Sequence, residues 1–162
     1  MREPSHDDAT LALTLYDLRR ERELRKARRM IGDLTMGTWE QVQKVMDYES
    51  KHNAHFRQAT SYWEMCASFV NRGIFHPAVY LDTCGEGLFT YAGLQPFIAR
   101  IREQNPRFMM QTEKAVSENP ILRERVDMIE KMMAAWRAEA EQERTQKAAK
   151  ARKDGKRKSK RK

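Results

Sequence analysis

Apolar positions recur along this chain at the three- and four-residue spacing of amphipathic helices. In residues 8–34 this spacing predicts one kinked helix or two consecutive helices, with Leu24 and Ile31 on the apolar face and a dense charged face opposite. We expect Asp7 or Asp8 to cap the start, because a short side-chain oxygen there can accept a free backbone N–H.

The middle of the chain predicts further helices. Thr38 and Gln41 form a capping-box pattern at the start of a short helix, and a longer helix covers about residues 51–72. Gly73 can adopt the left-handed conformation just past its end. The next helical stretch covers residues 77–84, and its first residue, a proline, suits the first turn of a helix.

Prolines also divide the second half of the chain. Pro96 is expected to bend or tighten locally a helix that carries Leu88 and Ile101, and a short helix follows near Phe108. The last helix begins near Pro120, and its apolar residues are spaced four, three, four and three. That spacing is typical of a seam that packs on another helix. The seam residues are candidates for packing or for contact with a partner protein: Leu122, Val126, Ile129, Met133 and Trp136.

The composition favours helices and one domain. Strand patterns are nearly absent, and the chain has only 7 Gly and 5 Pro in 162 residues. We therefore predict an all-α fold: a single irregular bundle of about six or seven helices over residues 8–140. A disordered N-terminus (1–7) precedes the bundle, and a frayed helix end with a disordered basic tail (141–162) follows it.

Two features suggest the compartment. No apolar run approaches the roughly 18 to 20 residues needed to cross a bilayer. The N-terminus is acidic and lacks the basic start and apolar centre of a signal peptide, and the 2 cysteines indicate no disulfide framework. The sequence therefore predicts a soluble protein of a reducing, cytoplasmic compartment.

The net charge of +8 is concentrated at the C-terminus. Residues 147–162 hold ten Lys or Arg and one acid, whereas the rest of the chain holds 21 basic and 22 acidic residues. Flexible cations attract polyanions by releasing counterions, and no aromatic residue is present to stack on bases. The candidate nucleic-acid-binding residues are Lys153, Lys156, Arg157, Lys158, Lys160, Arg161 and Lys162. An anionic membrane surface, or no single partner, is the alternative.

The stretch GIFHPAVYLDTCGEGLF, residues 73–89, is the densest in side chains that carry chemistry: His76, Asp82, Cys84 and Glu86. A cysteine nucleophile needs a base within hydrogen-bond reach, but eight residues of straight helix would separate His76 from Cys84 by about 12 Å. Paired metal ligands are also missing. We favour a structural corner, with His76 near a helix cap, Gly85 and Gly87 allowing a turn or close approach, and Cys84 as a small buried hydrophobe.

Other candidate sites are weaker. His52 and His55 lie on one helix face, but a metal site in a bundle needs matching ligands from other helices, so a solvated helix start is favoured. The ten methionines favour core packing, with an exposed groove for a partner helix as the alternative. No phosphate-binding glycine loop or catalytic motif is evident, and we predict no cofactor and no metal.

Two segments, LYDLRRERELRKARRMI and residues 62–103, resemble a bacterial family of uncharacterised helical proteins, domain of unknown function 4760. The shared pattern is an early Ala27–Arg28 pair, then Arg72–Gly73, an acidic corner, and a helix that ends in Arg102. The resemblance spans about residues 10–118 and implies a helical fold but no activity. Many relatives resemble membrane-tethered proteins with an apolar N-terminal segment, which is absent here, and the Cys-Gly-Glu-Gly at residues 84–87 also departs from the pattern.

These observations predict a non-enzymatic helical interaction module whose basic tail adds non-specific affinity for nucleic acid. Its expected partner is a protein or a second copy of the chain, and any membrane contact is at most peripheral. Two alternatives stay open. One is a small helical enzyme with a site near the 76–86 corner, and the other is a self-associating scaffold whose tail contacts anionic membrane.

Overall fold

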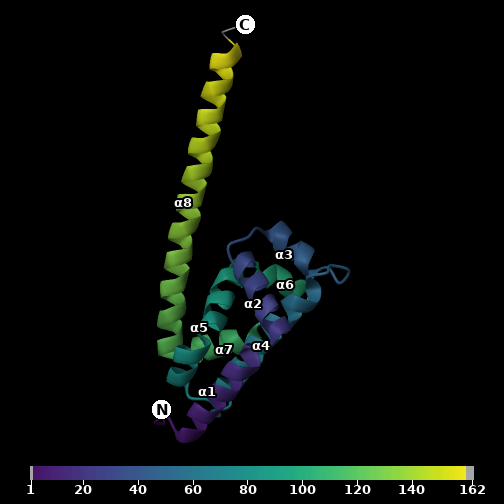
Figure 1. Ribbon diagram of the computed structural model, residues 1–162. Helices are drawn as coiled ribbons and strands as arrows, with labels where there is room; N and C mark the ends of the chain where they lie inside the picture. Colours follow the sequence, from purple (N-terminus) through teal and green to yellow (C-terminus); the bar gives the residue numbers. More distant parts are fainter. Residues whose placement is uncertain (1, 160–162) are drawn as a thin grey trace.

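A computed structural model describes the backbone of residues 2–159 and the side chains of residues 2–139, Gln142 and Thr145. Every regular element in this part of the chain is a helix, which confirms the all-α class (Figure 1). In chain order the elements are α1 (His6–Arg19), α2 (Arg22–Leu34), α3 (Trp39–Met46), α4 (Asn53–Asn71), α5 (Pro77–Leu94), the 3₁₀ turn η1 (Gln95–Phe97), α6 (Ile98–Gln104), α7 (Met110–Glu118) and α8 (Pro120–Ser159).

The helices form a body and a projecting arm. α4 packs against α2, α5 and α7, and so lies at the centre of the body. α8 packs on α5 and α7 along one side and then continues alone, away from the body, so that the C-terminal end is the far tip of the molecule (Figure 1). None of the helices in the described range is long and apolar enough to cross a membrane.

The core is continuous and rich in large side chains. Trp63 of α4, Tyr80 and Leu88 of α5, and Phe75 between these helices are fully buried. Burial of an apolar side chain such as Leu88 or Phe75 contributes about 1.5–3 kcal/mol. The amphipathic pattern predicted for residues 8–34 is also confirmed, because the apolar positions of α2 are all in this core: Leu24, Ala27, Ile31 and Leu34.

The N-terminal region differs from the prediction in two ways. The first helix is capped by Ser5, and Asp8 completes the capping box from the third helical position. The residues before the helix, predicted to be disordered, are attached to the body, because the buried Asp8 carboxylate binds the guanidinium of Arg2. Of the two arrangements predicted for residues 8–34, the structure has two consecutive helices.

The other predicted boundaries agree with the structure. Thr38 and Gln41 form the capping box of α3, and Gly73 has a φ of 69°, the left-handed conformation that ends α4. α5 contains a kink at Cys84, whose ψ of 18° is non-helical, so the predicted stop near residue 84 is a bend in one helix. Pro96 tightens the chain into η1, as predicted.

The predicted seam of α8 packs inside this chain. Leu122, Val126, Ile129 and Met133 are at most 2% exposed, since they face α5 and α7. These four residues are therefore core residues, and their assignment as a partner-binding surface is corrected. Trp136 alone of the five is substantially exposed, at 43%, with its ring 6.4 Å from that of Phe89.

α8 is longer than the sequence analysis predicted. We expected the helix to fray near residue 140, but its backbone is helical through Ser159. Ala, Lys, Arg, Glu and Gln dominate this stretch and are among the strongest helix formers, which explains the continuation. Residues 160–162 of the predicted tail lie outside the described residues.

Candidate functional site

The 73–89 corner is a structural junction. His76 caps α5, as its sequence position suggested: its Nδ1 accepts the N–H of Ala78 at 3.2 Å. The opposite ring nitrogen, Nε2, donates to the carbonyl of Arg2 at 2.7 Å. Since both ring nitrogens are engaged with the backbone, His76 is not placed to act as a base for Cys84.

Asp8 holds this junction together. Its carboxylate has no exposed surface and accepts hydrogen bonds from the guanidinium of Arg2, the N–H and hydroxyl of Ser5, and the N–H of His76. The Arg2 guanidinium, and then the backbone donors, hold the pKa of this carboxyl well below its usual range, although burial acts in the opposite direction. The network joins the N-terminus to the α4–α5 corner.

The two cysteines are buried thiols, and the prediction that Cys84 is a small buried hydrophobe is confirmed. A hydrogen bond with Cys84, and then burial, raises the pKa of the Cys66 thiol. A raised pKa disfavours the thiolate, which is the nucleophilic form. Gly87 allows the close approach that the sequence suggested, because a Cβ there would lie 3.0 Å from the Trp63 indole, whereas Gly85 faces open space.

Two of the three arginines in the family pattern, Arg28 and Arg102, make structural contacts through their side chains, whereas Arg72 is exposed. The guanidinium of Arg28 in α2 donates two hydrogen bonds to the carboxylate of Glu86 in α5. One runs from Nε to Oε1 at 2.9 Å, and the other from Nη2 to Oε2. Arg102 donates from Nε to the carbonyl of Phe108 at 3.0 Å and from Nη2 to Glu113 at 2.9 Å. Glu86 therefore pairs with α2, while Asp82 is exposed.

The histidine pair begins α4 without forming a metal centre. His52 is the residue before the helix, and His55 lies 3.4 Å from Glu23 of α2. In the described residues, no three His, Cys, Asp or Glu side chains converge on a point where they could hold a metal ion.

The exposed side of α2 is the strongest candidate for a binding surface. Arg22, Arg25, Lys26 and Arg29 recur at steps of three, one and three, which places them opposite the buried apolar side of the helix. We call these four residues the basic face of α2. Glu21, at the start of the helix, is occupied by the N–H groups of Glu23 and Leu24.

Most of the charge on the basic face is uncompensated. Among these four, only Lys26 forms an ion pair with a described residue, Glu23, at 2.7 Å. Arg25 donates to the carbonyl of Arg20 at 2.7 Å, which leaves its charge unneutralised. The side chains of Arg22 and Arg29 form no hydrogen bond or ion pair within the part of the chain that the structure describes.

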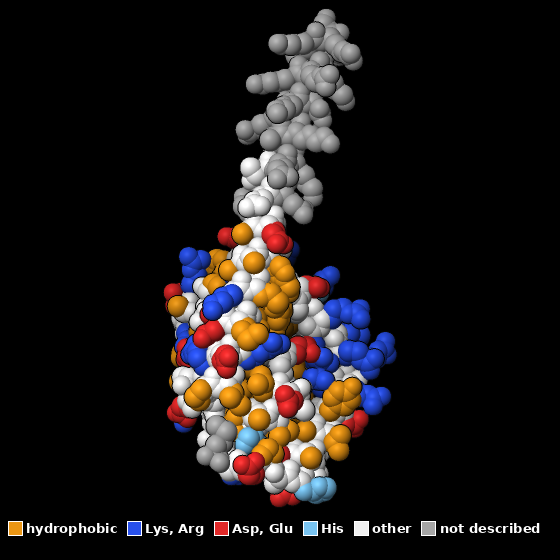
Figure 2. All heavy atoms as spheres, turned by 90° about the vertical axis from the view of Figure 1, so that its left-hand side faces the viewer, with side chains coloured by type: hydrophobic (Ala, Val, Ile, Leu, Met, Phe, Trp, Pro, Cys, Tyr) orange, Lys and Arg blue, Asp and Glu red, His pale blue; other side chains and the backbone are white. Residues whose placement is uncertain are grey.

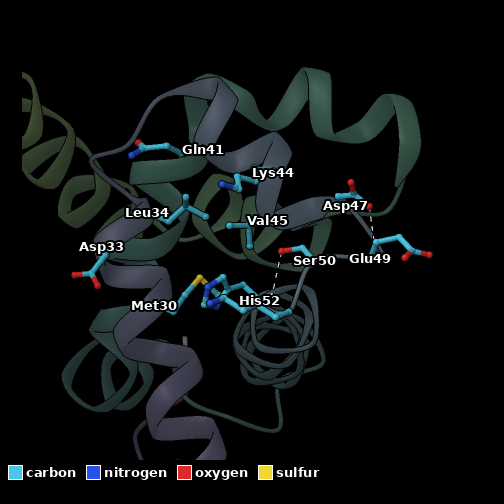
Figure 3. Close-up of a pocket in the computed structure, with 11 residues that line it drawn as sticks. Met30, Asp33, Leu34, Gln41, Lys44, Val45, Asp47, Glu49, Ser50 and His52 are labelled. Atoms are coloured by element: carbon cyan, nitrogen blue, oxygen red, sulfur yellow. Dashed lines mark hydrogen bonds between the residues drawn. The ribbon is translucent and has the colours of Figure 1, made fainter.

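The surface beside the basic face is concave. Arg22, Arg25, Lys26 and Arg29 line a hollow of about 680 Å³ together with Met30, Asp33, His52 and His55. A second hollow of about 750 Å³ adjoins it, shares Met30, Asp33 and His52, and extends over Leu34 and Val45 towards Lys44. In Figure 3, Met30 from α2 and His52 at the start of α4 point towards one another across this second hollow.

A smaller hollow continues the surface in the other direction. It has a volume of about 290 Å³ and is lined by Tyr16, Arg19, Arg20, Arg25 and Arg28. The guanidinium of Arg19 lies 4.9 Å from the centre of the Tyr16 ring. Arg25 lines both this hollow and the hollow beside the basic face. Together they form a groove with a basic wall that follows α2 from its junction with α1 towards α3. Figure 2 shows Lys and Arg side chains gathered along one side of the body.

Beyond its contact with α2, the described backbone of α8 leads away from this groove (Figure 1). Arg137 of α8 donates to the carbonyl of Thr35 at 3.2 Å, at the end of α2, and the helix projects beyond this point (Figure 1). The side chains of Lys153, Lys156, Arg157 and Lys158 lie outside the described set, as do residues 160–162 altogether. Their part in binding stays a prediction.

The basic face was not predicted as a binding site from the sequence. The dense charged face of RRERELRKARR was evident, but the near-neutral net charge of residues 1–146 concealed the local excess of positive charge. The sequence did indicate that the nearby acids are occupied. Glu21 lies at a helix start, where it caps the helix, and Glu23 lies within one turn of Lys26 and pairs with it. Asp33 lies one turn beyond Arg29 and lines the same hollow, but Arg29 forms no ion pair with it in the described residues.

The fold and this surface define an all-helical protein with a grooved basic side and a projecting C-terminal helix. The chain belongs to the family described as Domain of unknown function (DUF4760), which matches residues 4–118. This match confirms the resemblance seen in the sequence and covers α1 to α7, whereas α8 lies beyond it. No curated protein and no solved structure matches the chain.

Proposed function

We propose that this protein is a non-enzymatic interaction module that binds nucleic acid through its phosphates. The observation that carries the proposal is the basic face of α2, where Arg22, Arg25 and Arg29 point away from the core without carboxylate partners in the described part of the chain. The basic tail is the second contact, because its ten cations carry the same preference.

Arginine in this arrangement suits phosphate. Its planar guanidinium donates two parallel hydrogen bonds to phosphate oxygens and is more weakly hydrated than a lysine ammonium. Arg22 and Arg29 are seven residues apart, which corresponds to about 10 Å along the helix axis. The arginines can therefore contact more than one phosphate of a strand that follows the groove.

The same surface offers little for reading bases. Tyr16, His52 and His55 are the residues with aromatic rings that line the two hollows containing Arg25, and the Tyr16 ring is already covered by Arg19. No glutamine or asparagine lines the two hollows that contain Arg25. Binding that depends on phosphate alone is salt-dependent and largely indifferent to sequence.

The test compares full-length variants for binding to labelled single- and double-stranded nucleic acid over a salt series. The basic-face variant and its control each lose three positive charges, and the tail variant loses six. The basic-face variant carries Arg22→Gln, Arg25→Gln and Arg29→Gln. The tail variant replaces Lys156, Arg157, Lys158, Lys160, Arg161 and Lys162 by Gln. The matched control carries Arg107→Gln, Lys114→Gln and Lys131→Gln, three exposed cations outside the groove.

Each lost phosphate contact lowers the slope of log K against log salt by about 0.7–0.9. We expect the basic-face variant to lose about two to three such increments and the control to lose less than one. If the basic-face variant and the control lose the same amount of salt slope, nucleic-acid binding depends on net charge alone and not on the basic face. No binding by the wild-type protein would refute the proposal, and tight binding to anionic vesicles instead would assign the tail to membrane.

A further inference from the structure

α8 has a second stripe of side chains, about a quarter turn around the helix from the buried seam. It consists of Arg125, Met128, Met132, Trp136 and Glu139, at spacings of three, four, four and three. These spacings keep all five within an arc of about 80° around the helix. All are exposed, with Met128 at 55%, Met132 at 38% and Trp136 at 43%. We call these five residues the outer stripe of α8.

The outer stripe is self-complementary. Its spacing is symmetric about Met132, so a second α8 laid antiparallel with Met132 facing Met132 brings Met128 of one copy opposite Trp136 of the other. In the same register, Arg125 of each copy faces Glu139 of the other. The centre of the stripe is thus apolar on both sides, and its two ends carry opposite charges.

The charges at the ends of the stripe are free to make this contact. Arg125 and Glu139 have no hydrogen bond or ion pair from their side chains in the range that the structure describes. Figure 2 looks onto the side of the molecule along which α8 lies, and apolar side chains are visible along the helix there. The outer stripe is therefore unobstructed by the rest of the body.

From this complementarity we infer that two copies of the chain associate through the outer stripe as an antiparallel, two-fold symmetric dimer. A two-fold axis through Met132 uses the same patch on both copies, which is how most homodimers are built. Methionine adapts its shape to a facing surface, and tryptophan commonly anchors interfaces. The surface is small, so we expect a dissociation constant in the range of about 1–100 µM.

The tail disfavours the parallel alternative. Residues 147–162 carry nine net positive charges, and a parallel pair would place two such segments side by side at close range. An antiparallel pair directs them to opposite ends of the dimer.

This inference does not rest on the proposed nucleic-acid binding and concerns a different surface. It also differs from contact through the predicted seam, because four of the five seam residues are buried in the core of their own chain and only Trp136 also belongs to the outer stripe. A dimer with two divergent basic ends would add a second tail to each assembly without altering the basic face of α2.

The test is sedimentation equilibrium of the full-length protein, without nucleic acid, at concentrations from about 1 to 200 µM. Arg125→Glu alone, or Glu139→Arg alone, places like charges at both ends of the proposed contact. We expect each single reversal to weaken dimerisation roughly tenfold, because two attractive pairs become two repulsive ones. The double variant Arg125→Glu with Glu139→Arg restores opposite charges, and we expect it to dimerise like the wild type.

A matched control is Lys131→Glu, which changes the net charge by the same amount as Arg125→Glu but lies about a quarter turn away from the outer stripe. We expect it to dimerise like the wild type, whereas Met132→Lys, at the axis, should be monomeric. Circular dichroism checks that each variant stays folded. A monomeric wild type over the whole concentration range overturns the inference. If each single charge reversal weakens the dimer and the double variant does not restore it, the antiparallel register is wrong.

Discussion

Gly93 lies where three helices meet, and its replacement by alanine is a sensitive test of the packing. A Cβ at Gly93 of α5 would lie 2.3 Å from Cβ and 3.0 Å from Cα of Thr35. Thr35 is fully buried at the end of α2, and its carbonyl accepts a hydrogen bond from Arg137 of α8. Because the contact includes backbone, α2 or α5 must shift to make room.

Two opposing effects determine the size of the change in stability. In an unhindered helix interior, alanine stabilises by about 1 kcal/mol relative to glycine. Overpacking a core costs about 1–3 kcal/mol, and more where backbone must move. Since 2.3 Å is far inside van der Waals contact, we expect Gly93→Ala to lower the free energy of unfolding by about 2 kcal/mol net.

The same helix provides the controls. Gly85→Ala meets no heavy atom within 4 Å and should stabilise by up to about 1 kcal/mol. Gly87→Ala meets the Trp63 indole at 3.0 Å and should fall between the two.

Urea unfolding, monitored by circular dichroism, gives the urea concentration at the midpoint of unfolding. A change in this midpoint with an unchanged m-value is a change in stability. A thermal scan should show a decrease of about 4–8 °C for Gly93→Ala. If Gly93→Ala proves as stable as Gly85→Ala while the helical signal is retained, the close packing of α2 on α5 is wrong.

Three further predictions concern the N-terminal junction, the seam and the thiols. Asp8 has a depressed pKa, so its ionised form stabilises the fold above the unfolded pKa of about 3.9 and this stabilisation is lost as the pH falls further. The difference in melting temperature between wild type and Asp8→Asn should therefore narrow from about pH 5 to about pH 2; a constant difference would contradict the assignment. Leu122→Ala, in the buried seam, should cost about 2–5 kcal/mol in urea unfolding, whereas Leu13→Ala, at a 71% exposed position, should change stability by less than about 0.5 kcal/mol. Cys66 and Cys84 should react with a thiol reagent only slowly until the protein is unfolded, and rapid labelling of the native protein would show that one of them is accessible.

The boundaries of the helices were largely predictable because they depend on neighbours in the sequence. The capping box of Thr38 and Gln41, the left-handed Gly73 and the tightened turn at Pro96 all follow from contacts within a few residues. The start of α1 was predicted wrongly, since Ser5 and Asp8 can each cap a helix. The choice between them depended on a partner 68 residues away, the N–H of His76.

The candidate sites were harder to predict. The arginines of the basic face were visible in the sequence, but only the structure separates them from Arg28, which is paired with Glu86 across 58 residues. The outer stripe of α8 follows the same helical period as the buried seam, and the sequence pattern favoured the seam because its residues are more uniformly apolar. Nothing in either pattern states which one the body covers.

The sequence by itself determined that this protein is helical, where most helices begin and end, and that its charge gathers at one end of the chain. These properties depend on local propensity, capping and periodicity, which act over a few residues. The tertiary structure alone decided that the seam of α8 is core, that Glu86 neutralises Arg28, and that the basic face of α2 stays free. Those outcomes depend on which helix faces which, because burial and ion pairing are contacts between residues that the chain order keeps far apart.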